Sequence, residues 1–455
     1  MNRLWGNLIV AAHLRGQTRA PFLPRPRLEA VRDARVRRIV VHAARTVPYY
    51  RELFAREGID PRRIRGAADL DALPLVDPEV VRREPARFLS ESRRARGALA
   101  FLTSGRSGRP LEIHHDRRSL LANIAYGERE RAPVIALSGG SFRPRELYIG
   151  CETSNFRKVI AFYAASTRLP RPRRTVVSML APFDDVVAAI NEVRPDVLTA
   201  YGSFLDVFYR TVVARGITIH TPKVVMFMGE ALPPDRRAWI EEELGARVTS
   251  RYCATEAFKI GYFCEERAGF HVHEDLCHVR VRAADGSPAL PDEPGEVVIS
   301  NLVNYATVLL NYPMGDVAAL ASAACRCGRT QRLLSEVQGR VEDVLRLRSG
   351  ESLHPRAVWA ALKDDRSILQ YQLIQHALAR FELRLATVDE AAFPAARDRA
   401  ADALRRLLGA DVDIATSWHA DLGRSERART GKFRAVESRL GALSERPPSR
   451  PGERA

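Results

Sequence analysis

The sequence has little lysine and an excess of arginine. Of its 71 basic residues only five are lysine, namely Lys158, Lys223, Lys259, Lys363 and Lys432. The arginines are spread along the whole chain and do not gather into a local cluster with interleaved aromatic residues, the usual footprint of a nucleic-acid surface. The net charge of +16 is therefore attributed to solvated surface, and nucleic-acid binding is not expected.

Long apolar runs and dense cysteines are also missing. No stretch approaches 18 consecutive apolar residues, so no membrane span is predicted. The opening MNRLWGNLIVAAHLRG holds a short apolar patch broken by Asn7 and His13, without a small-residue cleavage site, and a signal peptide is not expected. Six cysteines in 455 residues do not make a disulfide framework, and a reducing cytoplasm is the expected location.

Two common catalytic signatures are absent. The phosphate-loop pattern G-x-x-x-x-G-K-[ST] cannot be fitted to the glycine-rich stretch at 101–110, and no G-x-S-x-G occurs. These absences argue against a P-loop nucleotidase and against a serine hydrolase. No internal repeat is found either, so a solenoid is not expected.

The sequence does contain a long α/β pattern. Residues 28–58 have helical spacing, and from about 98 to 250 apolar strand-like runs alternate with helical stretches. The runs are ALAFLTS, ELYIG, TVVSML, DVLTAYG, KVVMFMG and ARVTSRY. Strands that alternate with helices predict an α/β domain with a largely parallel sheet.

The composition changes twice after this region. Residues 270–348 hold shorter β-like runs with fewer helices, and 353–440 have the pattern of a small α+β unit. The tail 441–455, rich in proline, arginine and glutamate, is predicted to be disordered. A chain of this length is expected to form two or three domains.

Five short motifs carry the chemistry, and each alone has a plain explanation as a turn, strand end or linker. They are FLTSGRSGRP (101–110), SRYCATEA (250–257), YPMGDVAAL (312–320), GRVEDVLRLRSGE (339–351) and RTGKFRAVES (429–438). In the first, glycines and hydroxyl groups could bring backbone N–H donors to an anion, and a tight turn explains it equally well.

Together and in this order, the motifs resemble those of the adenylate-forming superfamily of acyl-CoA synthetases and luciferases. The closest likeness is to the phenylacetate-CoA ligase-like branch, which includes capsule-biosynthesis and coenzyme F390 synthetase-like proteins. The segments MGEALPPDRRAWIEEELGARVTSRYCATEA, GEVVISNLVNYATVLLNYPMGD and CRCGRTQRLLSEVQGRVEDVLRLRSGESLHP also fit, and the resemblance covers roughly 45–435.

The resemblance implies a multi-domain α/β architecture with two half-reactions. A large adenylation domain with a β-rich subdomain would span 1–339, a hinge 340–345 and a small α+β lid 346–440. A carboxylate would attack the α-phosphate of ATP, releasing pyrophosphate and forming an acyl-adenylate. CoA or another nucleophile would then displace AMP.

The resemblance also assigns nucleotide contacts. Thr103, Ser104, Gly105, Ser107, Gly108 and Arg109 would cradle the β- and γ-phosphates, while Gly229, Glu230 and Ala231 would border adenine. Tyr252 would stack on adenine, Asp316 would accept from the ribose hydroxyls, and Arg340 would reinforce that end. Four positions depart from the family pattern: Arg106, Arg109, Cys253 and the hinge residue Glu342.

The catalytic and acyl-binding residues follow from the same resemblance. Thr255 would donate to phosphate, Glu256 would hold Mg²⁺, and Lys432 would neutralise charge in the adenylation transition state. A surface lysine is the plain alternative for Lys432. The acyl pocket would be lined by Ser154, Asn155, Phe156, Tyr201, Gly202 and Ser203, which suit an aryl or a medium acyl acid.

A zinc site is a further prediction. Six residues separate Cys264 from His271, and Cys325 and Cys327 follow after 53 more. Three thiolates and one imidazole in two sequence-local pairs suit tetrahedral zinc, although the spacing is not a standard finger pattern. Buried free thiols are the alternative, and His273, Cys277 and His278 lie near enough to compete as ligands.

Several alternatives stay open at this point. The enzyme could end at an adenylated product or transfer the acyl group to an amine, and a degenerate fold could bind nucleotide or nucleic acid without catalysis. The predicted ligands are ATP or AMP, Mg²⁺, structural Zn²⁺, a small carboxylic acid and CoA as co-substrate. A homodimer is compatible with the sequence.

Overall fold

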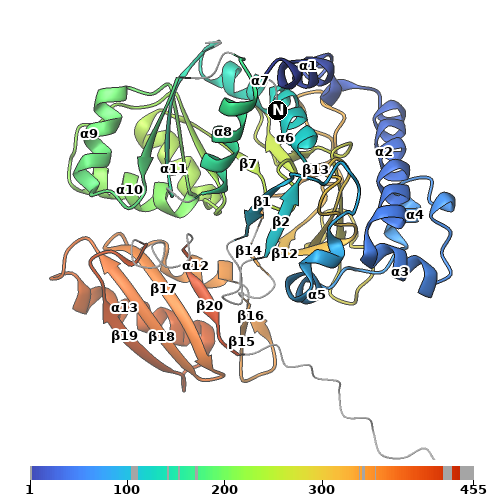
Figure 1. Ribbon diagram of the computed structural model, residues 1–455. Helices are drawn as coiled ribbons and strands as arrows, with labels where there is room; N and C mark the ends of the chain where they lie inside the picture. Colours follow the sequence, from blue (N-terminus) through green and yellow to red (C-terminus); the bar gives the residue numbers. More distant parts are fainter. Residues whose placement is uncertain are drawn as a thin grey trace, which may run out of the picture. The chain divides into compact units, whose positions relative to one another are not determined.

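The computed structural model describes most of the chain as two compact units (Figure 1). The described residues are 3–103, 111–140, 143–151, 154–169, 173–337, 339–340, 344–353, 355–423 and 433–440. Unit 1 holds the described residues up to 337, and unit 2 holds those from 339 onward. Each unit has a hydrophobic core of its own.

The centre of unit 1 is a mixed sheet with five parallel strands. In spatial order these are β4 (Arg173–Ser178), β3 (Arg145–Gly150), β5 (Val197–Ala200), β6 (Val224–Met228) and β7 (Arg247–Tyr252). The crossover helices are α8 (Asn155–Ser166), α9 (Phe183–Val193), α10 (Gly202–Ala214) and α11 (Pro234–Leu244). The predicted alternation of strands and helices is therefore present.

Helices cover both faces of this sheet, and the residues of β6 show why. Val225 and Phe227 lie in the main core together with residues of α9, α10 and α11. Val224 and Met226 pack instead with Val134 of α7 (Glu128–Leu137). An uninterrupted apolar strand such as VVMFM is buried on both faces, which is typical of parallel strands in α/β folds.

The sheet continues past β7 with three short antiparallel strands. These are β8 (Gly261–Phe263), β9 (Phe270–Val272) and β13 (Leu333–Leu334). One expectation is corrected here: the run ALAFLTS does not join the parallel sheet. It forms β1 (Leu99–Leu102), which pairs antiparallel with β2 (Glu112–His115). The short connection between them leaves no room for the crossover that a parallel pair requires.

Helices at the start of the chain pack on unit 1. They are α1 (Arg3–Leu14), η1 (Ala20–Phe22), α2 (Arg25–Thr46), α3 (Pro48–Arg56), η2 (Pro61–Arg63), α4 (Ala67–Asp71), α5 (Pro78–Arg83) and η3 (Pro85–Phe88). The helical stretch predicted at 28–58 is divided at Val47, which is extended with φ −114° and ψ 115°. Pro48 explains this division, since a proline disfavours helical geometry in the preceding residue.

A second sheet and one further helix complete unit 1. Strands β10 (Cys277–Arg282), β11 (Gly295–Asn301) and β12 (Tyr312–Ala318) form an antiparallel sheet, as the β-rich character of 270–348 predicts. Helix α6 (Arg117–Tyr126) follows β2 directly. The carboxylate of Asp116 caps α6 by accepting from the Ser119 amide at 2.9 Å.

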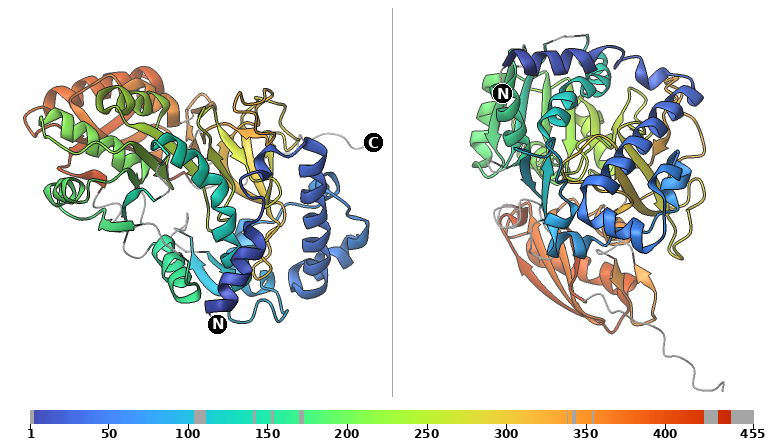
Figure 2. Two further views of the ribbon diagram at one scale, coloured as in Figure 1. Left: turned by 90° about the horizontal axis from the view of Figure 1, so that it is seen from above. Right: turned by 45° about the vertical axis from the view of Figure 1, so that its right-hand side comes forward.

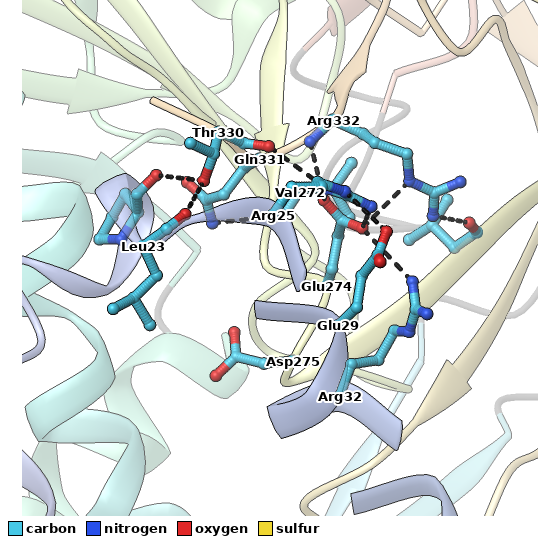
Figure 3. Close-up of polar contacts among 12 residues, drawn as sticks. Leu23, Arg25, Glu29, Arg32, Val272, Glu274, Asp275, Thr330, Gln331 and Arg332 are labelled. Atoms are coloured by element: carbon cyan, nitrogen blue, oxygen red, sulfur yellow. Dashed lines mark hydrogen bonds and ion pairs between the residues drawn. The ribbon is translucent and has the colours of Figure 1, made fainter. Parts of the chain in front are cut away.

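Buried carboxylates tie α2 to the strand region around β9 (Figure 3). Glu274 accepts two hydrogen bonds from Arg25, at 2.6 and 2.7 Å, and one from Arg332 Nε at 3.1 Å. Its neighbour Asp275 is paired with Arg129 at 2.6 and 3.0 Å and with Arg35 at 2.9 Å. These pairs compensate for the desolvation of two carboxylates that are almost fully buried.

Unit 2 is a small α+β fold, as predicted for this region. Its elements are β14 (Gly339–Arg340), β15 (Leu345–Arg346), β16 (Ser352–Leu353), α12 (Pro355–Leu362), β17 (Ile368–Ala377), β18 (Arg380–Thr387), α13 (Phe393–Leu408), β19 (Asp413–Trp418) and β20 (Val436–Ser438). The main sheet has the order β19-β18-β17-β20. Within the described residues, no helix is long and apolar enough to cross a membrane.

Candidate functional site

Most of the predicted site residues follow directly after parallel strands. Ser154–Phe156 come after β3, Tyr201–Ser203 after β5, Gly229–Ala231 after β6, and Thr255 with Glu256 after β7. Because neighbouring parallel strands point the same way, their carboxyl ends meet at one edge of the sheet. Ligands of open α/β sheets bind at this edge.

Tyr252 and Asp316 contact each other across two sheets. Tyr252 ends β7, and Asp316 lies in β12 of the antiparallel sheet. The tyrosine hydroxyl donates to Asp316 Oδ2 at 2.7 Å, and both side chains are largely buried. The Tyr252 ring lies 5.8 Å from the ring of Phe270, tilted by 43°. The predicted stacking and ribose roles of the pair stay predictions.

Asn155 connects the predicted phosphate loop to the threonine after β7. Its amide Nδ2 donates to the carbonyl of Leu102 at 2.7 Å and to Thr255 Oγ1 at 3.1 Å. Beside it, the Thr103 amide donates to the Leu111 carbonyl at 2.8 Å, and the Leu111 amide donates to Thr103 Oγ1 at 3.1 Å. Thr103 and Leu111, the described residues on either side of the predicted phosphate loop, are therefore joined by two hydrogen bonds.

Two residues that no sequence motif singles out bind the loop after β7. His115 Nε2 donates to the Thr255 carbonyl at 2.7 Å, and Asn301 Nδ2 donates to the Glu256 carbonyl at 2.9 Å. Burial lowers the pKa of His115 to about 4, so this imidazole is neutral near pH 7. The positions of His115 and Asn301 depend on the pairing of strands that are distant in the sequence, and no local sequence motif predicts this pairing.

Cys253, which departs from the family pattern, is an unreactive thiol in this environment. Burial raises the pKa of its thiol to about 11. The side chain is therefore an uncharged thiol at neutral pH, and it brings no negative charge near the predicted phosphate contacts.

Close approach explains the glycines after β5 and β6. A Cβ atom on Gly202 would lie 2.3 Å from the Ala231 carbonyl oxygen, so only glycine fits there. Gly229 has a φ of +76°, a conformation that favours glycine. Ser203, in the same region, donates a hydrogen bond from Oγ to Glu230 Oε2. A residue predicted to line the acyl pocket, Ser203, is thus in contact with a residue predicted to border adenine, Glu230.

Aromatic side chains gather around the end of β3. The rings of Tyr148 and Phe156 lie 4.4 Å apart, and the Arg174 guanidinium lies 5.0 Å from the Phe156 ring centre. Burial raises the pKa of Tyr201, whose side chain interacts with that of Tyr148. This cluster contains two of the residues predicted to line the acyl pocket.

Several predicted residues lie outside the described part of the chain. They are Ser104, Gly105, Arg106, Ser107, Gly108, Arg109, Glu342 and Lys432. Of Arg340, only the backbone, in β14, is described. Their assigned contacts with phosphate, ribose and the lid stay predictions.

The four predicted zinc ligands form one cluster. Ligand atoms of Cys264, His271, Cys325 and Cys327 all lie within 4.8 Å of one another. Cys264 Sγ is 3.7 Å from Cys325 Sγ, and Cys327 Sγ is 3.3 Å from His271 Nε2. Three sulfurs and one imidazole at such separations have the composition and closeness of a tetrahedral zinc site.

The charge of Arg329 favours the thiolate form of one cysteine of the cluster, Cys327. Burial raises the pKa of Cys327, but the amide and guanidinium of Arg329 outweigh this effect, and the net pKa is lowered. Burial raises the pKa of Cys264 to about 12 in the metal-free cluster. Among the alternative ligands, His273 pairs with Glu130 at 3.1 Å and His278 with Asp71 at 2.9 Å.

Comparisons with known proteins identify chains that are similar in sequence and in fold. No protein-family model matches the chain. A phenylacetate-coenzyme A ligase of Thermus thermophilus is 27% identical over 377 residues, 81% of this chain and 81% of that protein. A phenylacetate-coenzyme A ligase of Escherichia coli is 23% identical, over 70% of this chain and 73% of that protein.

Comparison with solved structures identifies the fold. The 2-hydroxyisobutyryl-CoA ligase in its postadenylation state matches with a TM-score of 0.70 at 20% identity, covering 92% of this chain and 91% of that one. The fold is that of the adenylate-forming enzymes, and the expected α/β class is confirmed. The chain is therefore similar in sequence to phenylacetate-coenzyme A ligases and shares its fold with an acyl-CoA ligase, as the resemblance in its motifs implies.

Proposed function

We propose that this protein is an acid-CoA ligase, which activates a small carboxylic acid with ATP as an acyl-adenylate and transfers the acyl group to CoA. The observation that carries the proposal is the convergence of the predicted adenylate contacts at the carboxyl ends of β3, β5, β6 and β7. The curated relatives of similar length are phenylacetate-coenzyme A ligases, which supports the same reaction class.

In this mechanism the chain's own residues bind and orient the substrates. Asp316, held by the Tyr252 hydroxyl, would accept hydrogen bonds from the ribose. Thr255, oriented by Asn155 and His115, would donate to a phosphate oxygen, and the Glu256 carboxylate would hold Mg²⁺, which neutralises phosphate charge when bound. The phosphate loop and Lys432 would stabilise the charge that develops as the carboxylate attacks.

The acid is proposed to be an aryl or medium-length acyl acid. The Tyr148, Phe156 and Tyr201 side chains offer a partly buried aromatic surface at the strand edge, and flat or apolar acids bury area against such surfaces. The Arg174 guanidinium, which lies over the Phe156 ring, is paired with Glu146 at 2.7 Å. The cluster therefore recognises the hydrophobic part of the acid.

A screen for pyrophosphate release over a library of carboxylic acids, with and without CoA, tests the proposal. The expected result is turnover of aromatic or medium-length acids, with thioester formed only when CoA is present. Turnover that ignores CoA would identify an adenylyltransferase, and turnover that needs an amine would identify an amide ligase. Nucleotide binding with no release on any acid would contradict the enzymatic proposal.

We also propose that Cys264, His271, Cys325 and Cys327 hold a structural zinc ion. The ligand atoms support this by their mutual distances, and the donor set suits zinc. Elemental analysis of the purified protein should find one zinc ion per chain, lost in Cys325→Ser and kept in Cys277→Ala, which removes a buried thiol outside the cluster. Protein that folds fully with zinc near zero would contradict the assignment.

A further inference from the structure

Helix α1 is apolar on the face that it turns to solvent. Trp5 exposes 57% of its surface, Leu8 61% and Leu4 59%. Ala11 and Ala12, one turn further along, are exposed as well. The opposite face is also apolar, since Ile9 and Val10 pack against Leu121 and Ala125 of α6. Figure 2 shows α1, in dark blue, on the outside of unit 1 beside α6.

A helix that is apolar on two opposite faces is normally covered on both of them. Within the part of the chain that the structure describes, α6 and α8 cover one side of α1 and leave the other exposed. Two further large apolar side chains at the start of the chain are exposed, since Leu14 and Phe22 expose 46% and 47% of their surface. A contiguous exposed patch of this type marks a docking surface.

The charge around this patch has one sign. Residues 1–28 contain five arginines, and the first acidic residue of the chain is Glu29. Arg3, Arg15 and Arg19 are exposed at the two ends of α1. Arg168 is also exposed, and its amide donates to Asn7 Oδ1 of α1 at 2.9 Å. An apolar strip is thus flanked by cations.

We propose that α1 docks the protein onto the surface of an anionic phospholipid bilayer. Trp5 and Leu8 would enter the boundary between headgroups and acyl chains, where amphipathic tryptophan is favoured. Arg3, Arg15, Arg19 and Arg168 would lie at the level of the anionic headgroups. Stable surface association needs two signals, and apolar insertion combined with a basic patch supplies both.

Other occupants fit these features less well. A second copy of the chain would bring the arginines of two α1 helices together without an acidic residue from positions 1–28 to compensate them, in a protein that carries +16. A nucleic acid would pair with the arginines but would leave Trp5 and Leu8 exposed to water. A bilayer with anionic lipid matches the charge and the apolar strip together. This inference is independent of the proposed reaction.

Sedimentation of the full-length protein with lipid vesicles tests the inference. We expect binding to vesicles of mixed phosphatidylserine and phosphatidylcholine, little binding to phosphatidylcholine alone, and release by added salt. The double variant Trp5→Ser, Leu8→Ser should lower the partition coefficient by about tenfold or more, because both apolar anchors are lost. Arg15→Gln and Arg19→Gln should each lower it by about fivefold.

Leu290→Ser is the matched control. Leu290 exposes 71% of its surface in a turn far from α1 in the sequence, so this substitution should leave vesicle binding unchanged. All these side chains are exposed, and circular dichroism should show unaltered folding. The inference is overturned by equal binding of the wild type and the Trp5, Leu8 variant, or by no binding to anionic vesicles. It is also overturned by concentration-dependent dimers that only this variant abolishes.

Discussion

The proposed nucleotide contact can be tested most directly at Tyr252 and Asp316. The Tyr252 hydroxyl donates a hydrogen bond to the Asp316 carboxylate at 2.7 Å. Asp316→Asn removes a charged acceptor, and we expect kcat/KM for ATP to fall by about 10- to 100-fold, since hydrogen bonds to charged groups contribute about 1.5–3 kcal/mol. Tyr252→Phe should lower it less, because the carboxylate remains. Steady-state kinetics over a range of ATP concentrations measure both changes.

A buried tyrosine elsewhere in unit 1 provides the control for Tyr252→Phe. Tyr209 in α10 is 1% exposed, and among the described residues its hydroxyl has no hydrogen-bond partner. Tyr209→Phe should therefore keep the kinetics of the wild type and cost no stability. If Tyr252→Phe and Tyr209→Phe both leave kcat/KM for ATP unchanged, Tyr252 does not support the nucleotide site.

His115 should make the protein sensitive to acid. Burial lowers its pKa to about 4 in the folded state, against 6.5 in the unfolded chain. The unfolded state therefore binds more protons between these values, and the free energy of unfolding falls as pH drops from 6.5 toward 4. The contribution is about 3 kcal/mol, and it is fully retained above pH 6.5. His271 and His273 have lowered pKa values too, so the wild type keeps a further pH dependence.

The variant His115→Gln isolates this effect, because glutamine can still donate to the Thr255 carbonyl without gaining a charge. Urea unfolding at pH 7 and at pH 4.5 should show a smaller acid-induced loss for the variant than for the wild type. An equal loss in both proteins would mean that His115 takes up its proton at the same pH whether the chain is folded or not.

Some residues of the candidate site could be predicted from the sequence, and others could not. Asn155 was selected as a pocket residue by resemblance, and its contact with Thr255 joins two selected motifs. His115 and Asn301 hold the same loop, yet each lies in an ordinary strand pattern. Their roles arise from hydrogen bonds between residues that are 140 and 45 positions apart in the sequence. The spacing of residues along the chain does not predict such hydrogen bonds.

At the scale of elements, α2 depends on the buried carboxylate of Glu274. Among the described residues, three arginines lie within ion-pair distance of it: Arg25, Arg32 and Arg332. Glu274→Ala leaves buried and half-buried guanidinium groups without their common partner, and we expect a loss of about 3–5 kcal/mol in the free energy of unfolding. Urea denaturation monitored by circular dichroism measures this loss.

Glu29→Ala is the control for this element, because Glu29 pairs with the same Arg25 at 2.9 Å but is 40% exposed. A surface pair of this kind contributes at most about 1 kcal/mol. Equal losses in the two variants would show that burial of the Glu274 network does not stabilise α2.

The elements themselves were largely predictable, and their arrangement was not. Runs such as ELYIG and KVVMFMG contain β3 and β6, since buried parallel strands are nearly continuous apolar segments. The spatial order β4-β3-β5-β6-β7 differs from the order in the chain and depends on how the crossover helices pack. The prediction that ALAFLTS joins the parallel sheet was wrong. Its strand β1 pairs with β2, which follows too closely in the chain for the crossover that a parallel pair needs.

At the scale of the molecule, the excess of arginine serves several purposes. Arg129 and Arg25 neutralise buried carboxylates inside unit 1, while Arg15 and Arg19 contribute to an exposed basic patch beside α1. The sequence alone gave one explanation, solvated surface, because composition does not distinguish buried from exposed guanidinium groups. The structure distinguishes the two groups, and the exposed arginines are the ones available to the docking surface that we propose for α1.

Two separate cores predict two thermal transitions. Leu198 is fully buried in the core of unit 1 and Leu383 in the core of unit 2. A leucine-to-alanine substitution in a packed core typically costs about 2–5 kcal/mol. Because each cavity weakens only the core that contains it, Leu383→Ala should lower the midpoint of one calorimetric transition, and Leu198→Ala the midpoint of the other. A single transition shifted by both variants would instead mean that the two units unfold as one cooperative body.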